Sequence, residues 1–309
     1  MTPGSTVLGI GEVLWDMLPG GRRLGGAPAN VLVHLKRLGH PVTYITAVGA
    51  DNLGREARRG LETLGVDTSF VRTAAAPTAR AEVVLDHDGT PRFTIRPGGA
   101  YESVDLADAD LARLVAARPV ALVFGTLAQR STTVRRATMD LAAAMPQELR
   151  FYDVNLRNDL WDAELIRGIA GAASFIKMDR AEAAVVAPLF EAPWPGTEGF
   201  CRALRARLRL HGVAVTAGAD PAALLVDDVY VERRPPTVTI ADTVGSGDAF
   251  AAALVDGLLA GAPADAILRR AVSLGALTAS RPGATPPWTT AELAAIEAAA
   301  DTADVRPVD

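Results

Sequence analysis

The chain has 309 residues, of which 49% are apolar and 22% are charged, and its formal net charge is −5. This size and composition predict a globular protein with one large domain, or one domain with an appendage. The negative charge, the lack of a Lys/Arg-rich block and the lack of a run of about 20 apolar residues argue against nucleic acid and membrane as partners.

The first residues and the cysteine content both predict a cytoplasmic protein. The start, MTPGSTVLGIGEV, lacks the charged end and the apolar core of a signal peptide. The single cysteine, Cys201, cannot form an internal disulfide, which is consistent with a reducing compartment. The four histidines do not have the spacing of metal ligands, so we expect no zinc site.

The first third of the chain predicts two strand–helix pairs followed by strands alone. A strand over residues 7–14 ends near Asp16, and Pro28 suits the first turn of the helix that follows. A second strand, over 43–48, leads through a loop into a helix that ends near Leu64. The next strands have no helices between them and predict a small separate sheet; they span 69–73, 80–85 and 91–95, with a hairpin turn over 86–89.

From residue 106 onward, helices and strands alternate. Helices are expected over 106–117, 132–144, 163–172 and 200–210, and strands over 120–124, 149–153, 174–178 and 213–217. This alternation predicts an α/β fold with a doubly wound, mainly parallel sheet and helices on both faces. The rest of the chain should form a hairpin over 222–226 and 229–233, a strand over 238–240, and helices over 249–259, over 264–279 and from Thr290.

The stretch DTVGSGDAF, residues 242–250, has the features of a site for phosphoryl transfer. Gly245 and Gly247 let the backbone turn with exposed amides, and the positive end of the following helix would add to their attraction for an anion. A carboxylate is a poor anion ligand, so Asp248 indicates a base that takes a proton from the attacking nucleophile. Taken alone, the stretch is also compatible with an ordinary strand-to-helix turn.

Several polar segments follow predicted strands. They are Asp16, Lys177 with Asp179, residues 216–218, and the loop over 242–248. In an open parallel sheet, ligands bind beyond the carboxyl ends of the strands. We therefore expect groups for a polyol, a nucleotide and an anion to meet at one edge of the sheet.

Five segments resemble, in the same order, the ribokinase/PfkB family of sugar kinases. They are GGAPAN (25–30), VGADNLGRE (48–56), DVNLRNDLW (153–161), DTVGSGDAF (242–250) and RPGA (281–284). The similarity runs from about Gly9 to Pro287. It implies one ribokinase-like domain over 1–309, with a small β lid formed by about 13–26 and 79–97. It also implies ATP-dependent phosphorylation of a monosaccharide and a homodimer formed through the lid.

The resemblance further implies roles for individual residues. Asp248 resembles the catalytic base, Gly245, Ser246 and Gly247 resemble the anion hole, and Arg157 resembles an arginine near the sugar and the phosphate. The implied sugar ligands are Asp16, Gly25, Gly26 and Asn30, with Arg96 at the end of a lid strand. The residues implied to hold ATP and its Mg²⁺ are Lys177, Asp179, Glu182, Thr216, Gly218 and Ala219. Those implied to ring a monovalent cation such as K⁺ are Asp242, Val244, Thr278, Arg281 and Gly283.

Three positions depart from the pattern of that family. The Asn-x-x-Glu element near magnesium reads Asp179 to Glu182 here, and an aspartate can still hold hydrated Mg²⁺, so we expect altered affinity with function kept. Pro287 replaces a serine of the cation site, which leaves open whether potassium is required. Val272 replaces an asparagine that contacts adenine in some relatives, which implies apolar contact with the base.

Within that family, GEVLWDMLPGG (11–21), together with GGAPAN and DVNLRNDLW, resembles bacterial fructokinases, which implies conversion of D-fructose to fructose 6-phosphate. The Asp16 carboxylate suits the neighbouring hydroxyls of a neutral sugar. The main alternative is a 2-keto-3-deoxygluconate kinase, whose anionic substrate Asp16 would repel and Arg96 would attract. A nucleoside kinase and a non-catalytic sugar-binding regulator are further alternatives. A Rossmann dehydrogenase is not expected, because no G-x-G-x-x-G follows the first strand.

Overall fold

The computed structural model describes residues 6–18, 20–85, 91–157 and 159–303, and the chain divides into two compact units. The N-terminal unit comprises residues 2–148 and 157–161, and the C-terminal unit comprises 149–156 and 162–309 together with Met1. The hairpin turn expected over 86–89 lies outside the described residues. That the whole chain forms a single domain stays a prediction.

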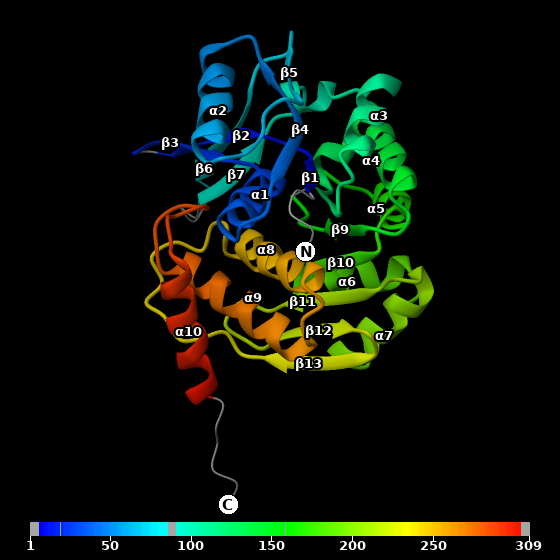
Figure 1. The fold of residues 1–309 in the computed structure, drawn as a ribbon, viewed down its shortest axis with the longest axis vertical. Helices are drawn as coiled ribbons and strands as arrows, with labels where there is room; N and C mark the ends of the chain where they lie inside the picture. Colours follow the sequence, from blue (N-terminus) through cyan, green and yellow to red (C-terminus); the bar gives the residue numbers. More distant parts are fainter. Residues whose placement is uncertain (1–5, 19, 86–90, 158, 304–309) are drawn as a thin grey trace, which may run out of the picture. The chain divides into compact units, whose positions relative to one another are not determined.

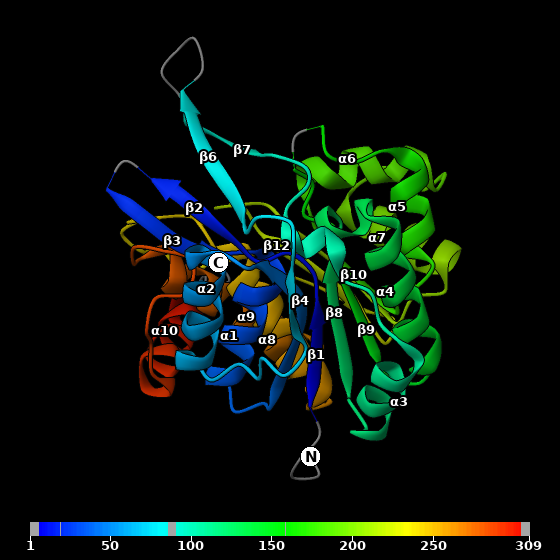
Figure 2. The ribbon, with the colours of Figure 1, turned by 90° about the horizontal axis from the view of Figure 1, so that it is seen from above.

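The N-terminal unit contains a parallel sheet with the strand order β8-β1-β4-β5. These strands are β1 (Val7–Ile10), β4 (Val42–Gly49), β5 (Val71–Ala74) and β8 (Ala121–Gly125). Its helices are α1 (Ala27–Arg37), α2 (Asn52–Thr63), α3 (Asp108–Ala116) and α4 (Thr132–Ala144), with 3₁₀ turns η1 (Ala100–Ser103) and η2 (Leu127–Arg130). In Figure 2, α1 and α2 lie on one side of these strands and α3 and α4 on the other. Because helices cover both faces, β1, β4 and β8 are buried at every position.

A second sheet of this unit has the order β3-β2-β6-β7 and corresponds to the expected lid. Its strands are β2 (Leu14–Leu18), β3 (Gly21–Gly25), β6 (Ala79–Leu85) and β7 (Pro91–Ile95). The β2–β3 and β6–β7 pairs are antiparallel, whereas β2 and β6 are parallel (Figure 2). The strand expected over 69–73 was wrongly assigned to this sheet. It is β5, which follows α2 and lies parallel to β4, as a β–α–β crossover requires.

The first strand ends earlier than the sequence predicts. The chain leaves the parallel sheet at Gly11, whose amide donates to the Ile45 carbonyl at 3.3 Å and whose carbonyl accepts from the Thr46 hydroxyl at 2.7 Å. A separate strand, β2, then begins in the small sheet, and Asp16 lies at its centre opposite Arg23. The prediction that Asp16 follows a strand of the main sheet was therefore wrong.

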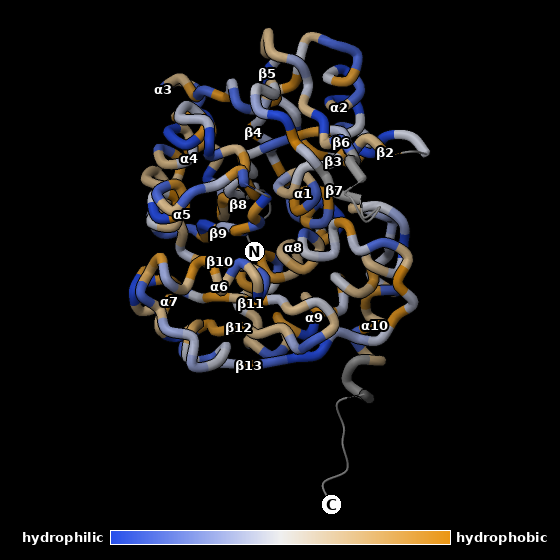
Figure 3. Tube along the Cα trace, turned by 180° about the vertical axis from the view of Figure 1, so that it is seen from behind, coloured by the Kyte–Doolittle hydropathy of each residue, from blue (hydrophilic) through white to orange (hydrophobic). Residues whose placement is uncertain are grey.

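The C-terminal unit has the strand order β13-β12-β11-β10-β9. The first three strands along the chain are parallel, and the last two form an antiparallel hairpin. The strands are β9 (Leu149–Asp153), β10 (Phe175–Asp179), β11 (Gly212–Thr216), β12 (Ala222–Val226) and β13 (Val229–Arg233). Figure 3 shows β12 mainly in hydrophobic colours and β13 in paler and more hydrophilic ones, in accord with the full burial of β12 and the partial exposure of β13.

The helices of this unit include one that the sequence analysis missed. They are α5 (Ala163–Ala170), α6 (Arg180–Leu189), α7 (Thr197–Leu208), α8 (Ser246–Leu259), α9 (Ala264–Ala279) and α10 (Thr290–Ala303). In Figure 1, α8 and α9 lie side by side, and α10 lies beside α9. Helix α6 was missed because Pro188 lies in its last turn and made the segment resemble a loop. The strand expected over 238–240 was wrong, because that segment is irregular and Ile240 is 59% exposed.

Candidate functional site

The predicted phosphoryl-transfer loop forms the start of helix α8. Gly245 is the N-cap residue and has φ of 78°, a left-handed conformation that favours glycine. A Cβ atom at this position would lie 2.4 Å from the Cα and the carbonyl oxygen of Ala284, so no side chain fits. The Ser246 hydroxyl donates to the Thr243 carbonyl at 2.9 Å and closes the loop. Asp248 lies in the first turn and is buried, so a carboxylate stands beside the positive end of the helix.

A buried ion pair lies next to this helix start. Lys177 on β10 donates to both carboxylate oxygens of Asp153 on β9, at 3.0 and 3.1 Å, and the two residues are 6% and 3% exposed. The Lys177 ammonium also lies 3.4 Å from the position that a Cβ on Gly247 would occupy. Burial alone would lower the pKa of Lys177, but the carboxylates of Asp153, Glu182 and Asp248 outweigh it and raise that pKa. A permanent positive charge therefore stands beside the predicted anion hole.

The expected magnesium residues Asp179 and Glu182 cap helix α6. The Asp179 carboxylate accepts from the Glu182 amide at 2.8 Å, and the Glu182 carboxylate accepts from the Asp179 amide at 2.8 Å. The other Glu182 oxygen accepts from the Leu156 amide at 2.7 Å, so this side chain joins the segment after β9 to the start of α6. Burial raises the pKa of Glu182. Because both Glu182 oxygens bind backbone amides, the exposed Asp179 is the more accessible of the two to a hydrated metal ion.

The predicted nucleotide loop follows strand β11. Thr216 is the last residue of that strand, opposite Asp179, and Gly218 has φ of 62°. Among the residues that the structure describes, none has an atom within 4 Å of a Cβ built on Gly218, so the backbone there is open to a ligand. The Ala219 carbonyl accepts from Arg234 at 3.1 Å. The expectation that these segments share one edge of the sheet therefore holds for the ends of β10 and β11, which are parallel neighbours.

The residues expected around a cation meet where the 242–248 loop contacts the end of α9. The Asp242 carboxylate accepts from the Val244 amide at 3.1 Å and from the Gly283 amide at 2.9 Å. Thr278 is fully buried in the last turn of α9, and within the described chain its hydroxyl has no hydrogen-bond partner. The Arg281 side chain instead binds the Pro287 carbonyl and Glu292. An orphaned buried hydroxyl at this junction fits an oxygen-binding cation such as K⁺.

The predicted sugar residues of the N-terminal unit are grouped where β2, β3 and α1 join. A Cβ on Gly25 would lie 2.7 Å from Asp16 Oδ2, so the Asp16 carboxylate lies against the Gly25 backbone. Gly26, at φ of 118°, precedes α1, and a Cβ there would lie 2.2 Å from the Glu12 carbonyl oxygen. Asn30 is buried in the first turns of α1, and its backbone N–H donates to the Gly26 carbonyl at 2.9 Å. The two glycines thus allow a close approach that any side chain would block.

Glu12 is a structural residue of this group that sequence reasoning missed. It is 4% exposed, and its carboxylate accepts from the Ala27 amide at 3.1 Å, at the start of α1. Helix α1 has glycine at its N-cap and no side-chain cap of its own. Glu12 therefore supplies the cap from 15 residues away, and no local pattern indicates such a long-range bond.

Two predicted arginines lie at more exposed positions. Arg96 donates to Glu82 Oε2 at 3.1 Å, and its side chain is 78% exposed, so its charge is already compensated by a carboxylate. Arg157 is also exposed, and its carbonyl accepts from the Leu160 amide at 2.9 Å. Neither position is buried as Asp248 and Lys177 are.

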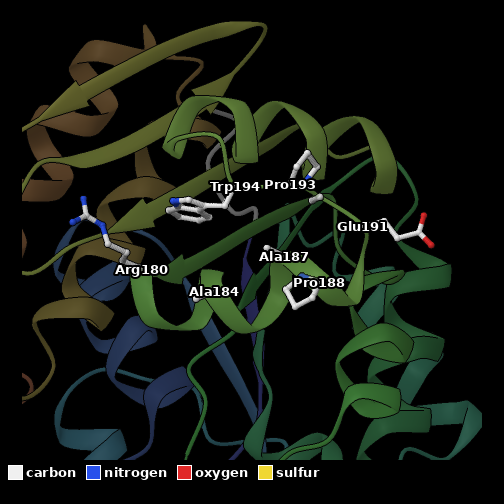
Figure 4. Close-up of a pocket in the computed structure, with 8 residues that line it drawn as sticks. Arg180, Ala184, Ala187, Pro188, Glu191, Pro193 and Trp194 are labelled. Atoms are coloured by element: carbon white, nitrogen blue, oxygen red, sulfur yellow. The ribbon is translucent and has the colours of Figure 1, made fainter.

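A pocket of about 780 Å³ in the C-terminal unit is lined by none of the predicted residues. It lies along α6 and the loop that follows it, with Trp194 above the helix and with Arg180 and Glu191 at opposite ends (Figure 4). In the described part of the chain, no group of three or more His, Cys, Asp or Glu side chains has the arrangement of a metal site. Nor does any described helix have the length and apolar character needed to cross a membrane.

Comparisons with known proteins place the chain in a family. The pfkB family carbohydrate kinase profile matches residues 20–291. A fructokinase of Klebsiella pneumoniae is 33% identical over 270 residues, which cover 81% of this chain and 83% of that protein. An aminoimidazole riboside kinase of Salmonella typhimurium is 29% identical over 261 residues, covering 80% of this chain and 78% of that protein.

The fold agrees with this assignment. The crystal structure of fructokinase with bound ATP from Xylella fastidiosa superposes with a TM-score of 0.81 at 24% identity, covering 95% of this chain and 98% of that one. Like this chain, such kinases combine a large, mostly parallel sheet with a small lid sheet. The chain therefore belongs to the pfkB family of carbohydrate kinases, ATP-dependent phosphotransferases with the ribokinase-like fold.

Proposed function

We propose that this kinase phosphorylates a neutral monosaccharide at a primary hydroxyl, and that the sugar is D-fructose, converted to fructose 6-phosphate. The observation that carries the proposal is the Asp16 carboxylate against Gly25, a group suited to neighbouring hydroxyls and repulsive to an anionic sugar acid. The Arg96 charge that would favour such an acid is paired with Glu82. The similarity to a fructokinase supports the same choice.

In this proposal, the chemistry rests on the start of helix α8. The backbone of Gly245, Ser246 and Gly247 faces the transferring phosphoryl group, since the first turn of a helix leaves amides such as that of Gly247 without intrahelical partners. Asp248 accepts the proton of the attacking hydroxyl as the bond to phosphorus forms, because the transition state is loose and the alcohol need not ionise beforehand. Lys177 offsets part of the negative charge that develops on the phosphoryl group.

The nucleotide and its ions would be held by the surrounding loops of the C-terminal unit. Thr216, Gly218 and Ala219 carry the phosphates and ribose of ATP beyond strand β11. Asp179 holds hydrated Mg²⁺, which neutralises charge on the phosphate oxygens when bound. The loop carbonyls of Asp242 and Val244, with Thr278, Arg281 and Gly283, would hold K⁺. Because the reaction uses ATP, we also propose that the protein is cytoplasmic. We further propose that it forms a homodimer through its small sheet.

The substrate assignment is tested by measuring ADP release over a panel of acceptors. Fructose should give the highest kcat/KM, with tagatose and ribose weaker, and with 2-keto-3-deoxygluconate and aminoimidazole riboside weaker still. The last compound is included because a relative is named for it. An Asp16→Asn variant should lose affinity for fructose while its ATPase background stays unchanged. Turnover of aminoimidazole riboside or the keto acid above that of every neutral sugar would overturn the proposal.

A further inference from the structure

Helix α2 carries three arginines that line a pocket in the N-terminal unit. Arg55, Arg58 and Arg59 lie at positions i, i+3 and i+4, so they share one face of the helix. The pocket has a volume of about 590 Å³, and its other lining residues come from the end of β4, the loop that follows it, α2 itself and β5; they are Val48, Gly49, Ala50, Gly54 and Thr73. None of these residues belongs to the predicted catalytic, sugar or nucleotide groups.

The positive charge of this pocket is not neutralised by the chain itself. Arg58 donates to the carbonyl oxygens of Thr68, at 3.2 Å, and Val71, and Arg55 donates to the Asn52 amide oxygen and the Ala50 carbonyl. These acceptors are all neutral. Over the residues that the structure describes, no carboxylate lies within ion-pair distance of Arg55, Arg58 or Arg59. Like charges one turn apart on a helix repel one another, so the cluster costs stability unless an anion fills it.

The acidic residues nearest in sequence bind groups other than these three arginines. Glu56 pairs with Arg22 of the β2–β3 hairpin, and Glu62 accepts from the Thr68 hydroxyl at 2.7 Å. Asp51 caps α2 by accepting from the Gly54 amide at 2.7 Å, and it also accepts from the Thr78 hydroxyl and amide at 2.7 and 2.9 Å. Counting the Asp51 charge against the three guanidinium groups leaves the pocket with a net positive charge.

We propose that this pocket binds a small phosphate-bearing anion. Guanidinium groups present paired N–H donors that match phosphate oxygens, and they keep their charge at any physiological pH. Arg55 and Arg59 lie one turn apart on the same face of α2 and both line the pocket, so both guanidinium groups can contact one occupant. A tetrahedral phosphate offers oxygens in several directions, whereas a carboxylate offers two in one plane. Arg58, whose guanidinium is held by two carbonyls, adds a fixed charge at the side of the pocket.

The test is a calorimetric titration of the full-length protein with inorganic pyrophosphate in the presence of saturating ADP, so that the predicted nucleotide site is already filled. The wild type should bind one pyrophosphate, and the affinity should fall with added salt. The Arg55→Gln/Arg59→Gln variant should bind at least about tenfold more weakly, because it loses two charge-assisted contacts. Arg58 is left unchanged, since its bonds to Thr68 and Val71 help to hold the fold.

The matched control is Arg202→Gln/Arg207→Gln, which removes two exposed arginines from helix α7 and changes the net charge equally. It should bind pyrophosphate as the wild type does. Equal affinity of the Arg55/Arg59 variant and the wild type, or no saturable binding to the wild type, would overturn the proposal. Titration with citrate separates the ligand classes: tighter binding of citrate than of pyrophosphate would overturn the assignment to phosphate. Neither result depends on which sugar the enzyme phosphorylates.

Discussion

The two units hold their predicted functional residues in different ways. In the C-terminal unit, Lys177 and Asp153 form an ion pair that is almost fully buried, and both Glu182 oxygens bind backbone amides. In the N-terminal unit, the hairpin that carries Asp16 is joined to α2 by an exposed pair, Arg22 and Glu56, whose side chains are 41% and 38% accessible. Buried, fully bonded groups keep one geometry, whereas exposed pairs contribute little and rearrange easily.

This difference matches the demands of the two halves of the reaction. Phosphoryl transfer needs donors fixed at one place, because preorganised groups stabilise the transition state without reorganising. If the hairpin binds the sugar as proposed, its role is recognition, which does not require donors fixed against a transition state. Substitutions in the C-terminal unit should therefore have the larger effects, and those in the hairpin should be milder.

The largest effect is expected at the predicted base. Replacing Asp248 by Asn removes the proton acceptor and keeps the side chain's size, so kcat should fall by about 10²- to 10⁴-fold. The measurement is steady-state ADP release, with circular dichroism to verify the fold. Asp256→Asn, two turns further along α8 and paired with Arg270, is the control and should stay close to the wild type. Near-normal turnover of the Asp248 variant would contradict the prediction that Asp248 is the catalytic base.

The next effect concerns the buried pair. Lys177→Met leaves the Asp153 carboxylate buried without its partner, which should lower the free energy of unfolding by about 3–5 kcal/mol in urea denaturation. The double variant Lys177→Met/Asp153→Leu should recover part of this stability, because the Asp153 carboxylate is no longer buried without its partner. It should not recover activity, since the positive charge beside Gly247 is still missing. The exposed Lys36→Met substitution serves as the control.

The pH dependence of this pair provides a second check. The folded-state pKa of Lys177 is raised above the ordinary value of 10.5. Below pH 10.5 its charge therefore makes its full contribution to the stability of the fold. That contribution is lost as the pH rises through the higher folded-state pKa. The difference in stability between the wild type and Lys177→Met should thus be constant through neutral pH and shrink only in strong alkali. A difference that shrinks near neutral pH would contradict the raised pKa.

Motifs with their own local chemistry could be predicted from the sequence, and long-range arrangements could not. The start of α8 was identifiable because glycine, helix start and carboxylate lie together in 242–250. The pairing of Lys177 with Asp153 depends on the register of two strands, 24 residues apart. Asp16 lies in the small sheet because strand β1 ends before Gly11, where the Thr46 hydroxyl donates to the Gly11 carbonyl. The glycine-rich sequence of this segment resembled one continuous strand, so this strand end was not predicted.

A third prediction tests how tightly the anion-hole loop is held. Gly245→Ala should destabilise the protein and lower kcat, because the added methyl group meets the Ala284 backbone in a left-handed conformation. The control is Gly261→Ala, at φ of 62° but, among described residues, with no atom within 4 Å of the new Cβ, so it should cost only about 1 kcal/mol. Thermal unfolding and ADP release of both variants separate the two causes. Equal destabilisation would mean that conformation alone, and not contact with Ala284, makes Gly245 necessary.

The smallest effect is expected in the hairpin. Arg22 lies 5.3 Å from the centre of the Trp15 ring and pairs with Glu56, and Trp15 in turn donates to the Leu53 carbonyl at 3.0 Å. Arg22→Gln removes an exposed pair worth no more than about 1 kcal/mol, so the KM for the sugar should rise by less than about fivefold while kcat stays unchanged. Lys36→Gln, at an exposed position of α1, changes the net charge equally and controls for long-range electrostatics. A loss of kcat as large as that of Asp248→Asn would show that the hairpin needs the same fixed geometry as the start of α8. A loss of that size indicates an interaction that is made in the transition state.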